Sequence, residues 1–294
     1  MKSGFVSIIG RPNVGKSTLL NNIIGKKIAI TSNKPQTTRN IIQGIYNEDD
    51  TQIVFVDTPG IHKPKHKLGN YLNKQSYMMI EDVDVVLFMV DASEGLGSGD
   101  KFILERLKTI NKSVILILNK IDKLSNDEIL LKIDEYKDLY DFAEIIPLSS
   151  LKNKNVDRLI EVLKKYMTDE IKYFDENTIT NVKTSFIISE YVREKVLELT
   201  NEEVPHSVTC LVENIEYKKN IVNIQVCIIV DRDNLKKIII GKNGEMLKKI
   251  GTMARHDIEK YLDKKIYLEL YVKSVKNWRD KEKYLQEFGF KDFE

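Results

Sequence analysis

Several features that mark particular classes of protein are scarce in this chain of 294 residues. It contains only two cysteines, Cys210 and Cys227, without a CxxC spacing, and four histidines, so neither a disulfide framework nor a zinc site is expected. No apolar run approaches the ~20 residues that a membrane span needs. Residues 1–11 lead directly into a glycine loop and do not resemble a signal peptide. We therefore expect a cytoplasmic protein with buried thiols and no disulfide partner.

The chain also lacks a strong excess of either charge. Its 46 basic residues are nearly matched by 44 acidic ones, which gives a formal net charge of +2. A surface that binds nucleic acid must therefore be local. The composition, 42% hydrophobic and 31% charged, indicates a folded protein, and its length favours two domains.

The first half of the chain alternates short β-branched runs with amphipathic stretches. Near-continuous apolar strands with helices between them are typical of a mainly parallel, doubly wound α/β sheet. A helix over 156–167 is expected to close this domain, which we place at residues 1–168. Strands are predicted at 6–9, 53–56, 85–90, 114–118 and 145–148.

A different pattern follows an acidic, polar segment, residues 169–183, which is expected to be a linker. The second domain is placed at 184–294. A helical period comes first, then alternating runs over 207–215 and 221–229 that predict a hairpin. Two helices around a glycine loop and a strand over 266–272 complete an α-β-β-α-α-β order, which predicts an α+β domain.

The segment from Gly10 to Ser17, GRPNVGKS, fits the phosphate-loop pattern GxxxxGK[ST] between a predicted strand and a predicted helix over 17–24. Its glycines let backbone N–H groups turn toward phosphates, and the helix N-terminus adds positive potential. Lys16 would contact the β and γ oxygens, and Ser17 would be a ligand of Mg²⁺. The loop alone leaves open whether the nucleotide is GTP or ATP, and whether it is hydrolysed or transferred.

A second phosphate motif, Asp57-Thr58-Pro59-Gly60, follows the strand over 53–56. The Asp57 carboxylate would emerge where open α/β sheets bind ligands, and would hold Mg²⁺ directly or through water. Gly60 lacks a Cβ, so its N–H can approach the γ-phosphate. Taken alone, the tetrapeptide is more often a turn. The expected phosphate-binding residues are Gly10, Arg11, Pro12, Asn13, Val14, Gly15, Lys16, Ser17, Asp57, Thr58, Pro59, Gly60 and Ile61.

A third motif, Asn119-Lys120-Ile121-Asp122, follows the strand over 114–118. The Asp122 carboxylate can accept from both the 2-amino group and N1–H of guanine, whereas adenine offers neither donor in that arrangement. Alone the motif would be a helix-capping loop, but its place behind two phosphate motifs favours guanine. Weaker candidates follow the strand over 145–148. The expected guanine-binding residues are Asn119, Lys120, Ile121, Asp122, Ser149, Ser150 and Leu151.

The polar loop 31–40 is long enough to move when the γ-phosphate leaves. A hydroxyl from it, Thr37 or Thr38, would reach Mg²⁺ only while that phosphate is present. An ordinary polar loop is the alternative. With the segment 57–70, this loop is expected to form the switch of the domain.

A GxxG loop, Gly241-Lys242-Asn243-Gly244, lies between two predicted helices of the second domain. In KH domains such a loop lets an RNA backbone come close, beside an apolar groove for unpaired bases. Residues 236–251 hold five lysines against one glutamate, a net charge of +4, while the alternative is a helix–loop–helix with a solvated lysine face. The expected RNA-binding residues are Gly241, Lys242, Asn243, Gly244, Lys236, Lys237, Lys248 and Lys249.

With these motifs the chain resembles the Era family of ribosome-assembly GTPases. The resemblance includes a switch I sequence and extends through 202–207, 240–245 and 276–279. It implies a P-loop GTPase domain followed by a type II KH domain, with slow hydrolysis of GTP to GDP. It also implies Mg²⁺ bound by Ser17, Asp57 and Thr38. The switch I residues are Gln36, Thr37, Thr38, Arg39 and Asn40.

The partners implied by the resemblance are the 3′ end of small-subunit ribosomal RNA and the small ribosomal subunit during its assembly, with no DNA. The family resemblance also suggests peripheral attachment to the cytoplasmic face of the inner membrane. Two rivals fit parts of the sequence. One is a P-loop small-molecule kinase, which the guanine motif disfavours, and the other is a membrane-associated GTPase whose second domain binds protein.

Ile61 stands where many switch GTPases carry a glutamine that orients the attacking water. The resemblance suggests a potassium ion held by Asn13 as a replacement, which is a hypothesis at this stage. His62 and His66 are candidates for a replacement base, but they lie in a strongly basic segment, so a solvated or partner-facing role is the favoured alternative.

Overall fold

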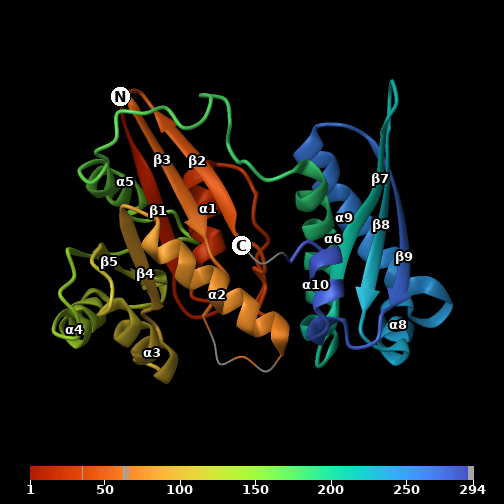
Figure 1. Cartoon of the computed structure of the whole chain (residues 1–294), viewed down its shortest axis with the longest axis horizontal. Coiled ribbons are helices and arrows are strands. Elements are labelled where there is room, and N and C mark those ends of the chain that lie inside the picture. Colours follow the sequence, from red (N-terminus) through yellow and green to blue (C-terminus); the bar gives the residue numbers. More distant parts are fainter. Residues whose placement is uncertain (35, 62–63, 65, 291–294) are drawn as a thin grey trace. The chain divides into compact units, whose positions relative to one another are not determined.

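The computed structural model describes residues 1–34, 36–61, 64 and 66–290. The chain forms two compact units, seen in Figure 1. The first contains Met1–Ala29, Thr38–Lys63 and Leu72–Asn181, and the second contains Ile30–Thr37, Pro64–Tyr71 and Val182–Glu294. Within the described residues, no helix is both long and apolar enough to span a membrane.

The first unit is built on a six-stranded sheet in the order β2-β3-β1-β4-β5-β6. All neighbours pair in parallel except β2 and β3, which are antiparallel. Every residue of β3 and β4 is buried, as expected for strands covered by helices on both faces. The mainly parallel sheet is therefore confirmed. The strands are β1 (Lys2–Ile9), β2 (Ile42–Glu48), β3 (Thr51–Asp57), β4 (Val85–Asp91), β5 (Ser113–Asn119) and β6 (Glu144–Pro147).

Strand β2 is absent from the sequence-based prediction. Its sequence IQGIYNE buries only part of its residues, so it lacks the continuous apolar run of the central strands. It forms because Asp49, at a left-handed φ of 47°, turns the chain back and lets β2 pair with β3 along its whole length. The tertiary pairing, and not a strong local signal, defines this edge strand.

Apart from the turn between β2 and β3, helices connect the strands of the first unit (Figure 1). One core cluster joins Phe88 of β4 and Leu116 of β5 to Leu104 of α3. The helix expected over 156–167 ends earlier, at Lys164. The helices are α1 (Lys16–Ile24), α2 (Lys67–Glu81), α3 (Ser98–Leu107), α4 (Asn126–Lys137) and α5 (Val156–Lys164), with a 3-10 turn, η1 (Ile121–Lys123).

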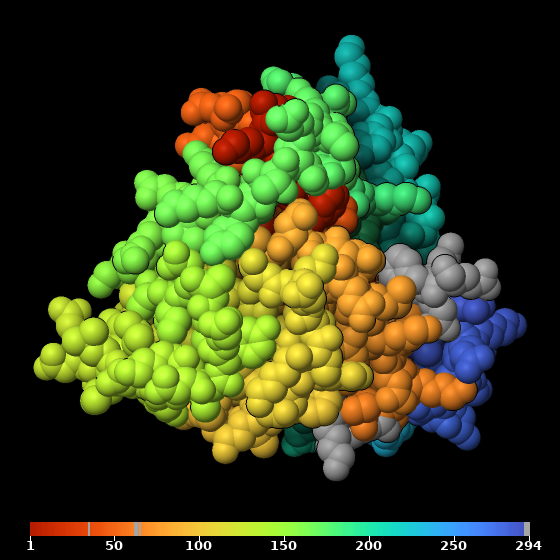
Figure 2. Space-filling model, turned by 60° about the vertical axis from the view of Figure 1, so that its left-hand side comes forward, coloured from red at the N-terminus to blue at the C-terminus, as the bar shows by residue number. Residues whose placement is uncertain are grey.

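The segment expected to be a linker is bonded to the sheet of the first unit as far as Asn181. Figures 1 and 2 show this green segment beside the red and orange N-terminal strands. The backbone of Asp169 pairs with Ser3, and the N–H of Ile45 donates to the carbonyl of Ile179 at 2.9 Å. The polar composition of this segment does not distinguish a free linker from a segment that is held by backbone hydrogen bonds, so the sequence alone did not predict this attachment.

Gln52 of β3 is the main side-chain anchor of that segment. Its fully buried amide accepts from the N–H groups of Tyr173 and Phe174 at 2.9 and 3.0 Å. The same amide donates to the Phe174 carbonyl at 2.9 Å and to Asn47 at 2.7 Å. One side chain thus satisfies several polar groups that no helix or strand would otherwise pair.

The second unit contains a three-stranded sheet in the order β7-β8-β9. The β7–β8 hairpin is antiparallel, and β9 joins β8 in parallel. The predicted α-β-β-α-α-β order is confirmed, and the described residues add two short α-helices, α7 and α10, and two 3-10 turns, η2 and η3. The elements are α6 (Thr184–Leu199), α7 (Val204–Ser207), β7 (Thr209–Tyr217), β8 (Val222–Val230), α8 (Asp233–Ile240), η2 (Lys242–Gly244), α9 (Glu245–Leu262), β9 (Ile266–Ser274), η3 (Trp278–Asp280) and α10 (Glu282–Glu287).

The core of the second unit lies between its sheet and its helices. Val192 of α6, Ile228 of β8 and Ile250 of α9 belong to one buried cluster. The 3-10 turn η3 is attached to α7, since its fully buried Trp278 donates the indole N–H to the Ser207 carbonyl at 2.9 Å. Both cysteines are free and buried.

Replacing Gln52 tests the anchoring of residues 170–181. Gln52→Ala leaves buried polar groups without partners, so we expect a loss of about 2 kcal/mol in the free energy of unfolding of the first unit, with faster proteolysis in that segment. The exposed pair of Lys172 and Glu176 provides the control, and Lys172→Ala should cost less than ~0.5 kcal/mol. Urea denaturation and limited proteolysis measure both effects. Equal stabilities of the two variants would contradict this anchoring.

Candidate functional site

The phosphate loop leaves β1 and enters α1 through left-handed backbone positions. Gly10, Asn13 and Gly15 have φ values of 156°, 66° and 110°. A Cβ on Gly10 would lie 2.3 Å from the Met89 carbonyl oxygen, so only glycine fits there. The motif therefore has the backbone form that turns N–H groups toward a bound anion.

Lys16 is buried at the start of α1 and closes the loop on itself. Its Nζ donates to the carbonyl oxygens of Gly10 and Arg11 at 3.2 and 3.0 Å. Burial lowers the pKa of Lys16 to about 8, although Asp57 acts in the opposite direction. An anion placed in the loop would compensate this buried charge.

Three side-chain oxygens converge beside the loop. Ser17 Oγ lies 2.6 Å from Asp57 Oδ2 and 2.8 Å from Thr38 Oγ1. Asp57 is fully buried, and its Oδ1 has no hydrogen-bond partner among the described residues. Mg²⁺ prefers oxygen ligands, so this set, with one unsatisfied carboxylate oxygen, fits that ion. Thr37 is not part of it, because its hydroxyl donates to the Lys34 carbonyl at 2.6 Å.

Burial also affects the Asp57 carboxyl group. It raises the pKa of Asp57 to about 6, although the charge of Lys16 and the hydrogen bond from Ser17 oppose the shift. The carboxylate therefore lacks enough protein partners to stabilise its charge fully. A cation ligand would supply the missing interaction.

The Asn119 carboxamide connects the loops that follow β1, β5 and β6. Its Nδ2 donates to the Val14 carbonyl of the phosphate loop at 2.7 Å. Its Oδ1 accepts from the backbone N–H and the hydroxyl of Ser150 at 2.9 and 3.0 Å. Both polar atoms of the Asn119 side chain, Nδ2 and Oδ1, are therefore hydrogen-bonded to other protein groups.

The remaining residues predicted to bind guanine lie in the segments that follow β5 and β6. Asp122 Oδ1 accepts a short hydrogen bond from Ser149 Oγ, and Leu151 is 73% exposed. Ile121 is buried below them, and its N–H donates to the Leu148 carbonyl. Sequence reasoning missed Asn22 of α1, whose amide donates to the Ser150 carbonyl. A lone asparagine on a helix gives no pattern that would predict this contact.

The residues after Asp57 lie against the phosphate loop. Thr58 Oγ1 donates to the Ile8 carbonyl at 2.9 Å, and a Cβ on Gly60 would lie 2.8 Å from the Pro12 nitrogen. Ile61 is 2% exposed, and its N–H donates to the Gly10 carbonyl at 3.3 Å. Its side chain packs in the hydrophobic core.

The segments 31–40 and 57–70, which are expected to form the switch, make specific contacts through their described residues. The Thr37 carbonyl accepts a short hydrogen bond from the buried Arg193 of α6, within the second unit. Arg39 is 1% exposed. Gln36 adopts a left-handed φ of 60° before them. Helix α2 already begins at Lys67, so the end of the segment expected to move is helical.

His62, one of the candidate bases, lies outside the described residues. His66 is described, and its Nδ1 lies 3.0 Å from Asp280 Oδ2 within the second unit. The neighbouring Lys67 pairs with Glu282 at 2.8 Å. This part of the basic segment thus has acidic partners within its own unit.

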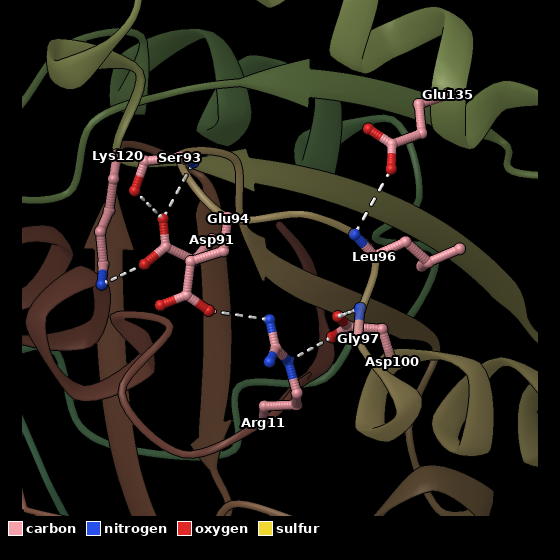
Figure 3. A network of polar contacts seen from close by, with 9 residues as sticks. All are labelled: Arg11, Asp91, Ser93, Glu94, Leu96, Gly97, Asp100, Lys120 and Glu135. Carbon is pink, nitrogen blue, oxygen red and sulfur yellow. Dashed lines mark hydrogen bonds and ion pairs between the residues drawn. The ribbon is translucent and has the colours of Figure 1, made fainter.

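Arg11 directs its side chain away from the phosphate loop. Its Nε lies 2.9 Å from Asp100 Oδ1 of α3, and its Nη2 lies 3.1 Å from Glu94 Oε2 (Figure 3). The Arg11 side chain therefore differs from the other residues predicted to bind phosphate, because its guanidinium pairs with carboxylates of the protein. Asp100 is fully buried, and no motif in the sequence identified it.

The GxxG loop joins α8 to α9 through left-handed positions at Gly241, Asn243 and Gly244, with φ values of 73°, 51° and 80°. A Cβ on Gly241 would lie 2.7 Å from Met246 Cβ, whereas one on Gly244 would meet nothing within 4 Å. The first glycine thus allows the tight turn, and the second leaves space for an approaching chain.

A groove of about 420 Å³ lies beside this loop. Its apolar side comes from leucines of α9 and β9, and its basic groups are Lys248 and Arg255. Arg255 was missed, although the spacing of 244, 248, 251 and 255 places these residues on one helix face. Lys242 lies in the loop itself, whereas Lys236, Lys237 and Lys249 are not among the lining residues. The groove is lined by Gly244, Leu247, Lys248, Gly251, Thr252, Arg255, Leu268 and Leu270.

Comparison with known proteins agrees with this geometry. The family described as 50S ribosome-binding GTPase matches residues 5–120, and the KH domain family matches residues 203–279. GTPase Era from Clostridium kluyveri, in two strains, is 51% identical over 294 residues, covering 99% of this chain and all of the relative. The chain belongs to the Era family of GTPases.

Two solved Era structures superpose on the chain with a TM-score of 0.95, at 43% identity and 99% coverage of both chains. One is a tyrosine-to-alanine variant from Aquifex aeolicus bound to GDP·AlF4⁻. The other is Era in complex with MgGDPNP and nucleotides 1506–1542 of 16S ribosomal RNA. The Era family, the GTPase domain followed by a KH domain, and GTP hydrolysis, all expected from the sequence, are thereby confirmed.

Two glycines at left-handed positions test the junction made by Asn119. A Cβ on Gly15 would lie 2.2 Å from Asn119 Nδ2, whereas one on Gly25, at a φ of 69°, would meet nothing within 4 Å. Gly15→Ala should displace Asn119 and weaken GDP binding at least about tenfold, the effect of losing one buried hydrogen bond. Gly25→Ala should cost only about 1 kcal/mol of stability. Titration with fluorescent GDP measures the affinity of each variant. Similar GDP affinities of Gly15→Ala and Gly25→Ala would contradict this role of Asn119.

Proposed function

We propose that this chain is a GTP-controlled switch that binds the 3′ end of small-subunit ribosomal RNA and assists assembly of the small ribosomal subunit. The observation that carries the proposal is the match, over 99% of both chains, to an Era structure that holds MgGDPNP and nucleotides 1506–1542 of 16S ribosomal RNA. The groove beside the GxxG loop has the chemistry for such a ligand. A P-loop kinase is disfavoured by the family membership.

The proposed RNA site combines apolar and basic groups. Leu247, Leu268 and Leu270 would contact unpaired bases, while Lys248 and Arg255 would pair with phosphates. Lys242 in the loop would add charge near the backbone. Because the net charge of the whole chain is only +2, such binding would depend on these local cations and would weaken with salt.

The proposed nucleotide site uses the backbone of the phosphate loop and the side chains around it. Lys16 would move its charge from the loop carbonyls to the β and γ oxygens, and Asp122 would accept from guanine. Ser17, Asp57 and Thr38 would hold Mg²⁺, which neutralises phosphate charge when it is bound. Thr38 belongs to the 31–40 segment, so loss of the γ-phosphate would release this part of the chain.

The attacking water needs an orienting group other than residue 61, because Ile61 is apolar and buried in the core. We propose a potassium ion near Asn13, a residue of the phosphate loop with a left-handed φ of 66°. An amide oxygen is a suitable donor for such an ion. A second positive charge beside the phosphates would stabilise the charge that develops during hydrolysis.

Peripheral attachment to the inner membrane is an expectation from the family resemblance alone. The described residues include no helix that could cross a bilayer, so attachment would have to occur through surface contact. Co-sedimentation with anionic vesicles would test it. It is not required for the RNA-coupled switch.

RNA binding can be tested with two glycines that both have open space beside them. Gly244 and Gly289 have φ values of 80° and 86°, and a Cβ on either would meet nothing within 4 Å. Gly244→Asp places a negative charge at the groove, so we expect at least about a tenfold loss of affinity for a short RNA from the 3′ end of small-subunit ribosomal RNA. Gly289→Asp should bind as the unmodified chain does. Fluorescence anisotropy with GDPNP or GDP present measures both, and unchanged binding by Gly244→Asp would exclude this groove.

The choice of monovalent cation tests the potassium proposal. Turnover of GTP with saturating RNA should be faster in KCl than in NaCl at the same ionic strength, because the smaller sodium ion would not occupy the same position. Choline chloride provides the reference for salt alone. If phosphate release is equally fast in all three salts, the attacking water is oriented in some other way.

A further inference from the structure

Arg11 has a role that the GxxxxGK[ST] pattern does not assign, because position 11 is a variable position of that pattern. Its guanidinium bridges from the phosphate loop to the loop and helix that follow β4 (Figure 3). Asp100 receives it at 2.9 Å and is fully buried, whereas Glu94, at 3.1 Å, is exposed. The ion pair with Asp100 therefore contributes more to holding Arg11 than the exposed pair with Glu94 does.

The position of Asp100 is itself fixed. Its Oδ2 accepts from the N–H of Gly97 at 2.9 Å, which caps the N-terminus of α3, while its Oδ1 faces Arg11. Both oxygens of this buried carboxylate thus have partners. Since α3 is a regular helix packed on the core, Asp100 offers a rigid point of attachment.

Two glycines leave the space that the arginine occupies. A Cβ on Gly97 would lie 2.9 Å from Arg11 Nη1, and one on Gly99 would lie 2.7 Å from Arg11 Cδ. The arginine stem and head group therefore pack closely against the N-terminus of α3, with 23% of the side chain exposed. This close packing holds the start of the phosphate loop in one place.

The part of the loop that Arg11 fixes contacts the γ-phosphate-sensing motif. The Gly10 carbonyl accepts from the N–H of Ile61 at 3.3 Å. Pro12 lies against Gly60, where a Cβ would be only 2.8 Å from the Pro12 nitrogen. Arg11 stands between these two contacts in the sequence, so a shift of residues 10–12 would move Gly60 and Ile61.

The same β4–α3 connection is also attached to the guanine motif. Asp91, at the end of β4, pairs with Lys120 at 2.5 Å and accepts from Ser93 at 2.6 Å (Figure 3). The backbone N–H of Leu96 donates a hydrogen bond to Glu135 Oε1 of α4 at 3.4 Å. The connection is therefore fixed at both ends and can resist movement of Arg11.

We infer that Arg11 is a positioning residue for GTP hydrolysis: through Asp100 it holds residues 10–12 so that Gly60 meets the γ-phosphate. This role predicts a selective effect. The contacts to the α and β phosphates would come mainly from the backbone of the later part of the loop, while Lys16 would reach the β and γ oxygens, so GDP binding should change little when Arg11 is replaced. Binding of the γ-phosphate and the rate of hydrolysis should fall together.

The test uses Arg11→Met, which keeps the apolar stem between the glycines and removes the charge. We expect GDP affinity within threefold of the unmodified chain, with GDPNP affinity and kcat each lowered about tenfold, equivalent to 1.4 kcal/mol. Arg106→Met removes an exposed arginine of α3 that lies over the Tyr77 ring, and it should alter none of the three quantities. A general loss of folding would instead lower GDP and GDPNP affinity equally.

Asp100→Asn completes the comparison, because its amide oxygen can still accept from Gly97 while its charge is lost. If Arg11 acts through Asp100, Arg11→Met in the Asp100→Asn background should lower kcat by less than threefold, since the contact is already lost. Glu94→Gln should have little effect. Full additivity of the Arg11 and Asp100 effects, or a GDP affinity lowered as much as the GDPNP affinity, would overturn the inference.

Discussion

The carboxamide of Asn119 joins loops that come from three distant parts of the sequence. It donates to the phosphate loop at Val14 and accepts from Ser150 beyond β6, while the residue itself ends β5. A buried amide of this kind costs free energy unless every donor and acceptor is paired. The phosphate and base regions are therefore mutually dependent, because neither loop can move without leaving part of this amide unpaired.

A second constraint is the pair of opposite charges placed beside that junction. Burial lowers the pKa of Lys16 and raises that of Asp57, so both shifts oppose ionisation. Folding therefore retains two groups whose charges are incompletely solvated. Such an arrangement favours ligands of opposite charge at the two groups, an anion at Lys16 and a cation at Asp57.

The sequence predicted the parts of this molecule that depend on local pattern. Uninterrupted apolar runs identified β3, β4 and β5, and the spacing of glycine, lysine and serine located the phosphate loop. Strand β2 was missed because its stability comes from pairing with β3. The segment at 169–183 was expected to be a linker, since the acceptor role of Gln52 cannot be deduced from one glutamine within an apolar strand. Arg11 and Arg255 depend on which elements pack together, which a single sequence does not specify.

The parallel pairing of β8 with β9 determines when the second domain can be completed during synthesis. Parallel neighbours need a crossover, and here the crossover consists of α8, the GxxG turn and α9. The GxxG loop thus emerges from the ribosome before β9, the strand that completes the sheet. A chain interrupted ahead of Ile266 would carry all strands of the GTPase sheet, yet its GxxG loop would have no completed core to support it.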